Sequence, residues 1–423
     1  MKTVDVKERV AGCVDALFDE EVSYVQELVR RPSRLGETNA CQRFVAESLA
    51  GFGLDVNEET IDVERLRRDP RYAPVSWSYE GLINVIATAK AGAAGGRSLI
   101  LNGHIDVVPE GHHDQWHVPP WSGVVKDGKL YGRGAGDMKG GIAAAIFALR
   151  AVQHAGCTLK GDVIVETVID EECCGNGTLA TLVQGHHADG AIIPEPLSGL
   201  VIGSTGVMWC QIRVFGRGAH AQSAAAAVNA AEKAYPIIKA LRAYEEELNA
   251  PARRHPIHEG HPHPYNINLG GVHGGVWASS VPEDCKLDVR IGFPPGISIE
   301  QMHDEVRGVV RRAADADPWL RENPPVVEFN GFHAPGWFID TETDLFKIVQ
   351  RNMERRTGKV PSLEAITGTT DNRYFSCEGI PNVCFGPAAE RIHAIDECVD
   401  LASLREVTHI IAATIIDFVG VER

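Results

Sequence analysis

The chain has 423 residues, of which 44% are hydrophobic and 23% charged, and its formal net charge is −16. This length exceeds one average domain and predicts two, with the composition of an ordinary globular protein. The acidic balance argues against a nucleic-acid groove, and no apolar run approaches the ~20 residues that cross a bilayer. We therefore expect neither a nucleic-acid nor a membrane partner. The charged N-terminus and ten scattered cysteines without a CxxC pair indicate a cytoplasmic protein with reduced thiols.

Helical and extended patterns alternate along the first half of the chain. Apolar residues at helical spacing predict three helices, over residues 6–31, 39–51 and 141–155. Short apolar runs predict three strands, over residues 82–88, 98–102 and 162–167. This alternation predicts an α/β sheet with its functional site at the carboxyl ends of the strands.

The pattern changes near residue 206. An alternating strand over 208–214 is followed by a long helix over 221–248, two strands around a Gly-rich turn within 264–293, and a helix over 298–314. This order predicts a smaller α+β sandwich inserted into the first domain. The expected division is a catalytic domain over 1–205 and 331–423 with an inserted domain over 206–330. The second catalytic part is predicted to contain a helix over 343–356 and a strand in PNVCFGP.

A histidine and two carboxylates stand near the centre of the first domain. His104 and Asp106 lie at the end of an apolar strand, and Asp137 follows among glycines that lead into a helix. Such groups at strand ends, facing a helix N-terminus, favour a cation site with room for substrate. The segment GRGAGD does not complete a dinucleotide-binding GxGxxG pattern, because Asp137 stands where the last glycine would be.

More acidic side chains follow other apolar runs. Asp170, Glu171 and Glu172 come directly after a predicted strand, and adjacent buried acids are costly without a cation. Glu195 stands between two prolines, which fix its backbone. His393 follows a later strand and supplies a second imidazole. Without thiolates, this set suits Zn²⁺, Mn²⁺ or Co²⁺, and a carboxylate outside the metal shell could act as general base.

The tract HPIHEGHPHP carries four further histidines, at positions 255, 258, 261 and 263. These could bind metal, but the prolines and the loop position favour a solvated connector.

Eight motifs occur in the order typical of one enzyme family: NGHIDVVP, GRGAGDMKGG, DEECCGNGT, PEP, GRGAHA, SSVPEDCKLDVR, GTTDNRYF and HAIDE. With these motifs, which span essentially the whole chain, the sequence resembles the M20 metallopeptidases, in particular their acetylornithine-deacetylase-like branch. The resemblance implies a catalytic domain with a mixed, mostly parallel sheet flanked by helices and an inserted α+β lid and dimerisation domain. It also implies two divalent ions per subunit, zinc first and manganese or cobalt as alternatives, and a homodimer formed through the inserted domain.

The resemblance also implies roles for the residues of the metal site. Asp137 would bridge the two ions, Glu171 would be the general base, and Asp106 would orient His104. The remaining ligands would be His104 and Glu195 on one ion, and Glu172 and His393 on the other.

Four further residues match family positions outside the metal shell. His220 matches a histidine that reaches the partner subunit's site and stabilises the oxyanion. Arg290 and Arg373 match positions associated with substrate anion recognition. Ser280 replaces an asparagine that helps to hold substrate in many relatives, so this pocket differs from one for a plain N-acyl amino acid.

Together these features predict a dinuclear metal hydrolase that cleaves the amide C–N bond of a small molecule such as an N-acyl amino acid. A metal-bridging hydroxide would attack, with Glu171 as general base. The alternative is a metal-dependent hydrolytic deaminase that releases ammonia from an aryl or cyclic amine. Two further hypotheses are thiol catalysis through Cys173 or Cys174 and a non-catalytic binding protein on the same fold.

Overall fold

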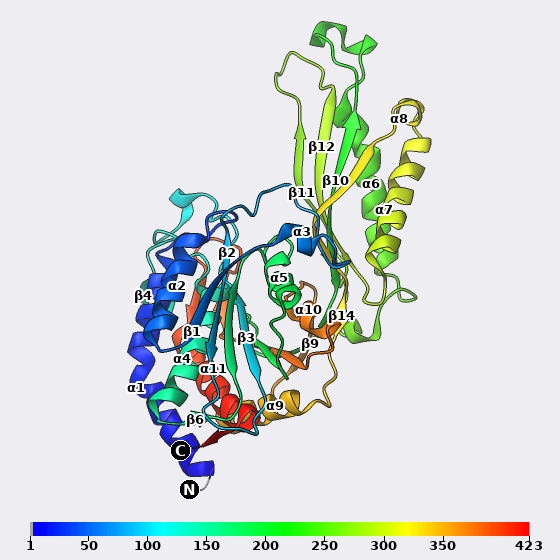
Figure 1. Cartoon of the computed structure of the whole chain (residues 1–423). Coiled ribbons are helices and arrows are strands. Elements are labelled where there is room, and N and C mark those ends of the chain that lie inside the picture. Colours follow the sequence, from blue (N-terminus) through cyan, green and yellow to red (C-terminus); the bar gives the residue numbers. More distant parts are fainter. Residues whose placement is uncertain (1–2, 423) are drawn as a thin grey trace.

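The computed structural model describes residues 3–422 and shows a larger lobe and a smaller, elongated lobe (Figure 1). The larger lobe holds the first and last elements of the chain, and the smaller lobe is formed by the middle of the sequence. No helix in the described residues is long and apolar enough to cross a membrane. All ten cysteines lie within those residues as free thiols.

A nine-stranded mixed sheet forms the centre of the larger lobe, with the order β1-β2-β7-β3-β8-β16-β9-β14 and β15 paired to β9. The strands, in this order, are β1 (Asp55–Thr60), β2 (Ile83–Ala89), β7 (Val163–Val168), β3 (Leu99–His104), β8 (Ala191–Ile193), β16 (Asn382–Cys384), β9 (Leu200–Ser204), β14 (Trp337–Phe338) and β15 (Leu363–Ile366). The central strands β7, β3, β8 and β16 run parallel to one another. All six residues of β3 are buried, as expected for a strand covered on both faces.

Helices cover this sheet. Three of them, α1 (Thr3–Val29), α4 (Gly141–His154) and α11 (Leu401–Thr414), pack against one another, and α9 (Asp344–Thr357) packs on α11. The run of small residues in α4 is buried almost all round, which allows its neighbours to approach closely. The remaining helices of this lobe are α2 (Asn39–Gly51), α3 (Val63–Leu66), α5 (Asn176–Gln184) and α10 (Asn372–Cys377).

Two small sheets complete the larger lobe. One contains β4 (Val124–Lys126), β5 (Lys129–Tyr131), β17 (Ala389–Glu390) and β18 (Cys398–Asp400), and the other contains β6 (Thr158–Leu159) and β19 (Val421–Glu422). The first of these sheets joins the chain around Tyr131 to the C-terminal part around Cys398. The predicted α/β catalytic fold, with a mostly parallel centre, is confirmed.

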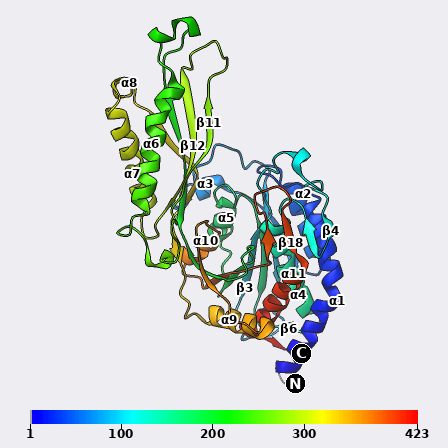
Figure 2. The ribbon, with the colours of Figure 1, turned by 180° about the vertical axis from the view of Figure 1, so that it is seen from behind.

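The smaller lobe is an antiparallel sheet with helices on one face (Figure 2). Its elements are β10 (Gly206–Phe215), α6 (Ala230–Leu248), β11 (Ile267–Gly274), β12 (Asp284–Phe293), α7 (Ile299–Asp315), α8 (Pro318–Glu322) and β13 (Val326–Ala334). It has a hydrophobic core of its own between the sheet and the helices. The inserted α+β sandwich is therefore confirmed, but its sheet contains a further strand, β13, which crosses the expected boundary at residue 330.

The predicted helix over 221–248 is too long at its N-terminal end. The α-helix begins at Ala230, where the Asn229 side chain accepts the N–H groups of Ala231 and Glu232. Before this cap, Val228 exchanges backbone hydrogen bonds with Arg217 at 3.0 and 2.8 Å. Because this β-bridge requires an extended backbone, the alanine-rich segment forms only a short 3₁₀ turn over Ala221–Ala226.

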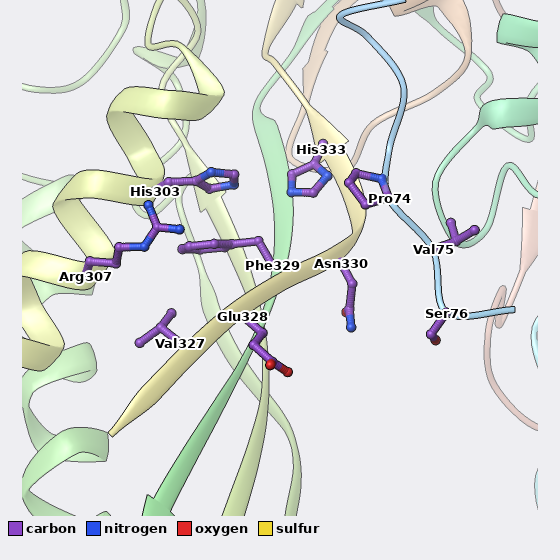
Figure 3. Close-up of a pocket in the computed structure, with 10 residues that line it drawn as sticks. All are labelled: Pro74, Val75, Ser76, His303, Arg307, Val327, Glu328, Phe329, Asn330 and His333. Atoms are coloured by element: carbon purple, nitrogen blue, oxygen red, sulfur yellow. The ribbon is translucent and has the colours of Figure 1, made fainter. Parts of the chain in front are cut away.

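A cavity of about 510 Å³ lies where the two lobes meet (Figure 3). Its wall includes Pro74 and its neighbours from the larger lobe and side chains of α7 and β13 from the smaller one. The His303 ring stacks on Phe329 with centroids 3.7 Å apart and lies 5.1 Å from the His333 ring. Burial lowers the pKa of His333 to about 4, so this junction holds a neutral imidazole near pH 7. None of the sequence-predicted site residues lines this cavity.

We expect Gly141 to be required for packing α4 against the end of β8. A Cβ atom there would lie 1.9 Å from the Pro194 carbonyl oxygen, whereas a Cβ at Gly12 in α1 would meet nothing within 4 Å. Gly141→Ala should lower the free energy of unfolding by about 1–3 kcal/mol. The control Gly12→Ala should raise it by about 0.5–1 kcal/mol. Urea denaturation measures both, and equal midpoints for Gly141→Ala and the wild type would refute this packing account.

Candidate metal centre

The carboxyl ends of three parallel strands bring four predicted residues to one edge of the sheet. His104 is the last residue of β3, Glu171 and Glu172 follow β7, and Glu195 follows β8. Because β7 and β8 both pair with β3, these ends are neighbours. This is the position at which α/β sheets generally bind ligands.

Asp137 is brought to the same place by the turn that precedes α4. Its backbone N–H and that of Gly136 both donate to Glu397 Oε1 at 3.0 Å. The other carboxylate oxygen of Glu397 pairs with Arg133, and both of these side chains are buried. Glu397 therefore fixes the backbone of Asp137 and leaves the Asp137 carboxylate free to face the strand ends.

The candidate ligands form two groups around the Asp137 carboxylate. On one side, His104 Nε2 lies 3.1 Å from Asp137 Oδ1 and 3.8 Å from Glu195 Oε2. On the other side, His393 Nε2 lies 3.3 Å from Asp137 Oδ2 and 3.0 Å from Glu172 Oε2. Ligand atoms of His104, Asp137 and Glu172 all lie within 4.8 Å of one another. The Asp137 carboxylate thus lies between two histidine–carboxylate pairs, and two cations could share it as a ligand.

The electrostatics of this cluster also fit cations. Burial, with the nearby charge of Asp137, raises the pKa values of Glu172 and Glu195 to about 7. The two histidines outweigh burial at Asp137 and hold its pKa below the usual range. Crowded carboxylates of this kind repel one another, and bound positive charge removes that cost. The nitrogen and oxygen donors, without thiolate, suit zinc-class divalent ions.

Asp106 contacts His104 through its backbone and the acidic loop through its carboxylate. Its backbone carbonyl oxygen, 2.9 Å from His104 Nδ1, is the close partner of the ring, while its carboxylate lies 3.8 Å away. The carboxylate instead accepts the backbone N–H groups of Glu171 and Glu172, both at 3.2 Å. With Nδ1 as donor, Nε2 of His104 is left as a ligand atom. Asp106 thus positions both sides of the site, and its carboxylate holds the acidic loop.

Glu171 stands apart from the two histidine groups. Its side chain is buried, it lines the same cavity as Asp137 and Glu172, and its Oε1 atom has no hydrogen-bond partner. A carboxylate next to a cation site but outside the ligand pairs can accept a proton from a bound water.

The cavity above the cluster has a volume of about 780 Å³. Apart from the acidic residues and His393, its wall comes from the segments 196–197, 363–370 and residue 392, and from Ile257, Gly260 and His261. The histidine-rich tract is a largely exposed loop, as its prolines predict, but it also contributes to the cavity wall. His258 is buried with its Nε2 atom 3.2 Å from the Ile366 carbonyl oxygen, and this contact brings the tract onto the cavity wall.

His220 and Ser280 do not reach this cavity within the chain. They form a backbone β-bridge with each other in the smaller lobe, and both are exposed. A role for either residue in this chain's own centre has no support from the geometry, and a role in a partner's site stays a prediction.

The two arginines are also not free in the cavity wall. Arg290 donates to the Thr367 carbonyl oxygen at 3.1 Å and is not among the residues that line the cavity. Arg373 is buried, and its guanidinium donates to the carbonyl oxygens of Cys174 and Thr370 at 2.7 and 2.9 Å. Substrate anion recognition by Arg373 therefore disagrees with this structure, because its donors already bind the backbone.

The cysteines beside the acidic loop are poor candidates for nucleophiles. Burial and the neighbouring carboxylates raise the pKa values of Cys173 and Cys174 above the usual range. The Cys174 thiol donates to Asp170 Oδ2 at 2.7 Å. The thiolate is the reactive form of cysteine. Because these surroundings keep both thiols protonated, they disfavour thiol catalysis.

The family model of peptidase family M20/M25/M40 matches residues 100–417. The chain belongs to this family. It is thus a hydrolase of a group that contains dinuclear metal enzymes, among them a dinuclear metal-binding M20 peptidase from Bacillus subtilis. That structure is 16% identical, with a TM-score of 0.59 over 96% of this chain and 99% of the other.

A relative with a named activity matches the chain over nearly its whole length. It is an N-formyl-4-amino-5-aminomethyl-2-methylpyrimidine deformylase from Halalkalibacterium halodurans, 31% identical over 432 residues, with 96% of each chain covered. A dipeptidase from Saccharomyces cerevisiae shares the fold, with a TM-score of 0.78 at 15% identity over 97% of this chain and 98% of the other.

Glu397 is expected to support metal binding although it is not a ligand. Glu397→Gln replaces one acceptor oxygen by an NH₂ group, so the side chain can no longer hold both the Asp137 turn and Arg133 as it does now. Residues that orient a metal ligand typically change affinity 10–100-fold, and we expect a loss of this size in competition with a chromophoric chelator. Glu390→Gln, in an exposed pair with Lys129, is the control. Equal affinities for the two variants would show that Glu397 has no such role.

Proposed function

We propose that this protein is a dinuclear metal-dependent amidohydrolase that removes a small acyl group from the nitrogen of a small-molecule amine. The observation that carries the proposal is the placement of two histidine–carboxylate groups on the two oxygens of Asp137, with Glu171 beside them in one cavity.

The ligand sets would be His104, Asp137 and Glu195 for one ion, and Asp137, Glu172 and His393 for the other. Zinc suits these donors best, and manganese or cobalt are the alternatives. Bound ions would polarise the amide carbonyl and lower the pKa of water at the site.

Glu171 is proposed to move the proton during hydrolysis. Its carboxylate takes a proton from the attacking water as the water oxygen bonds to the carbonyl carbon. The same proton then passes to the nitrogen as the C–N bond breaks, so Glu171 is returned to its starting state. The products are a carboxylic acid and an amine, and no other reactant is required.

The cavity wall favours one class of amide. None of the described residues that line it is lysine or arginine, so the carboxylate of an N-acyl amino acid would find neither of these cationic partners in the cavity wall. Leu197, Ile257 and Ile366 offer an apolar surface for a flat ring, and the Glu364 carboxylate offers an acceptor for an amino group. With the deformylase relative, these features support a formylated or similarly acylated heteroaromatic amine as substrate.

A homodimer through the smaller lobe and a cytoplasmic location remain part of the proposal. His220 is exposed on the smaller lobe, which contains none of the proposed metal ligands. An exposed histidine there could enter the site of a partner subunit. In that arrangement His220 would stabilise the negative oxygen that develops during attack.

A product assay tests the function. The protein would be incubated with N-formyl-4-amino-5-aminomethyl-2-methylpyrimidine and with N-acetyl amino acids, after zinc loading or chelator treatment, and formate, acetate, amine and ammonia would be measured separately. We expect zinc-dependent release of formate and amine, with much lower turnover of the acetyl amino acids. Glu171→Gln should keep its metal and lose about 10²–10⁴-fold in kcat.

Glu390→Gln, at an exposed carboxylate paired with Lys129 outside the cavity, should retain metal-dependent hydrolysis and serves as the matched control. Release of ammonia with the acyl group intact would instead support the deaminase alternative. Hydrolysis that persists after complete metal removal would contradict the proposed function.

A further inference from the structure

Arg373 lies directly behind the acidic loop Asp170–Gly175, which carries Glu171 and Glu172. Its guanidinium and the Tyr374 hydroxyl both donate to the Cys174 carbonyl oxygen, at 2.7 and 3.0 Å. A second guanidinium nitrogen donates to the Thr370 carbonyl oxygen at 2.9 Å. Because the planar guanidinium fork makes these bonds together, the position of α10 fixes the position of the acidic loop.

The contact between Arg373 and the loop leaves no free space. At Gly175, where φ is +80°, a Cβ atom would lie 2.0 Å from the Arg373 guanidinium and 2.6 Å from Asp371 Oδ1. Asp371 is itself held by a hydrogen bond of 2.6 Å from the Thr178 hydroxyl. Because Arg373 and the loop are in direct contact here, we expect a displacement of Arg373 to move the loop.

Arg373 also faces the side chain of the proposed base. One guanidinium nitrogen lies 4.0 Å from Glu171 Oε1, the buried oxygen that has no hydrogen-bond partner. Among the described residues, no other arginine or lysine lies within ion-pair distance of Glu171. A cation at this distance restrains the direction of the carboxylate without binding it tightly.

The other side of Arg373 meets the smaller lobe. The Phe332 ring on β13 lies 5.6 Å from the guanidinium carbon, and Trp209 on β10 packs edge-on against Phe332 with centroids 5.3 Å apart. The preceding residue, Gly331, donates its N–H to the Pro74 carbonyl oxygen at 2.8 Å. Figure 3 shows this part of β13 passing beside Pro74 at the junction of the lobes. Phe332 is therefore held between the smaller lobe and Arg373.

We propose that Arg373 is a positioning residue for Glu171 and that Phe332 transmits the position of the smaller lobe to it. The inference rests on the proposed function, because it requires Glu171 to be the base. It assigns Arg373 to the alignment of the proton acceptor rather than to the binding of a substrate anion. A change in the angle between the lobes would then alter proton transfer through a direct contact.

The test compares two phenylalanines of one strand. Phe332→Leu removes the ring that faces Arg373, and Phe329→Leu removes the ring that stacks on His303 and does not contact Arg373. For the deformylation reaction we expect Phe332→Leu to lower kcat about tenfold, with KM within about twofold of wild type and full metal content. Phe329→Leu should leave kcat unchanged.

A second pair of variants tests the path of the effect. Arg373→Lys keeps the charge but loses the fork, and it should lower kcat by at least the same factor with metal retained. The double variant Phe332→Leu/Arg373→Lys should be no slower than Arg373→Lys alone, because both changes act through one contact.

Three results would overturn the inference: equal kcat values for Phe332→Leu and Phe329→Leu, effects that multiply in the double variant, or a wild-type kcat for Arg373→Lys. If Phe332→Leu does not fold, the kcat of metal-loaded Arg373→Lys decides. Failure of the proposed function is recognised separately, because the wild-type protein would then release no formate or would release it without metal. An inactive Glu171→Gln beside a fully active Arg373→Lys would refute only the inference made here.

Discussion

The structure depends on the concentration of acidic side chains at the ends of three parallel strands. Glu171, Glu172 and Glu195 follow β7 and β8, and Asp137 is held against them by the turn before α4. Burying this many carboxylates together is unfavourable unless positive charge is present, as the raised pKa values of Glu172 and Glu195 indicate. The surrounding protein fixes these groups through backbone contacts, so the centre is organised before any substrate arrives.

The same fold also places the smaller lobe where it can act on the centre. Its histidine-rich tract reaches the cavity wall through Ile257 and His261, and its strand β13 reaches Arg373 through Phe332. The smaller lobe thus contributes both to the surface that meets substrate and to the support of the proposed base. The described residues that line the cavity include no lysine or arginine, and this observation supports the proposed amide substrate without a carboxylate.

Much of this could be predicted from the sequence, because local patterns and position along the chain agree. His104 and Glu195 follow apolar strands, and parallel strands bring such residues to one edge. The family motifs supplied the roles of residues such as Asp137 and His393. The predicted start of α6 was wrong, because a β-bridge between Arg217 and Val228 overrides the helical propensity of the alanines.

Other features of the site depend on contacts between distant segments, which single-sequence patterns do not contain. The histidine-rich tract packs on the Ile366 carbonyl through His258, and Arg373 bonds to a carbonyl 199 residues away. The carboxylate of Asp106 holds the acidic loop rather than the ring of His104, since backbone N–H groups of that loop lie closer. The repeated histidines mark the tract in the sequence, but its position at the cavity wall follows only from tertiary packing.

The most direct test of the central claim is the metal stoichiometry of purified, zinc-loaded and desalted protein, measured by inductively coupled plasma mass spectrometry. If two ions share Asp137, the wild type should hold two zinc ions per chain, His104→Ala and His393→Ala about one each, and Asp137→Asn close to none. Retention of wild-type zinc by Asp137→Asn, with the fold intact by circular dichroism, would contradict the shared centre on which this account is built.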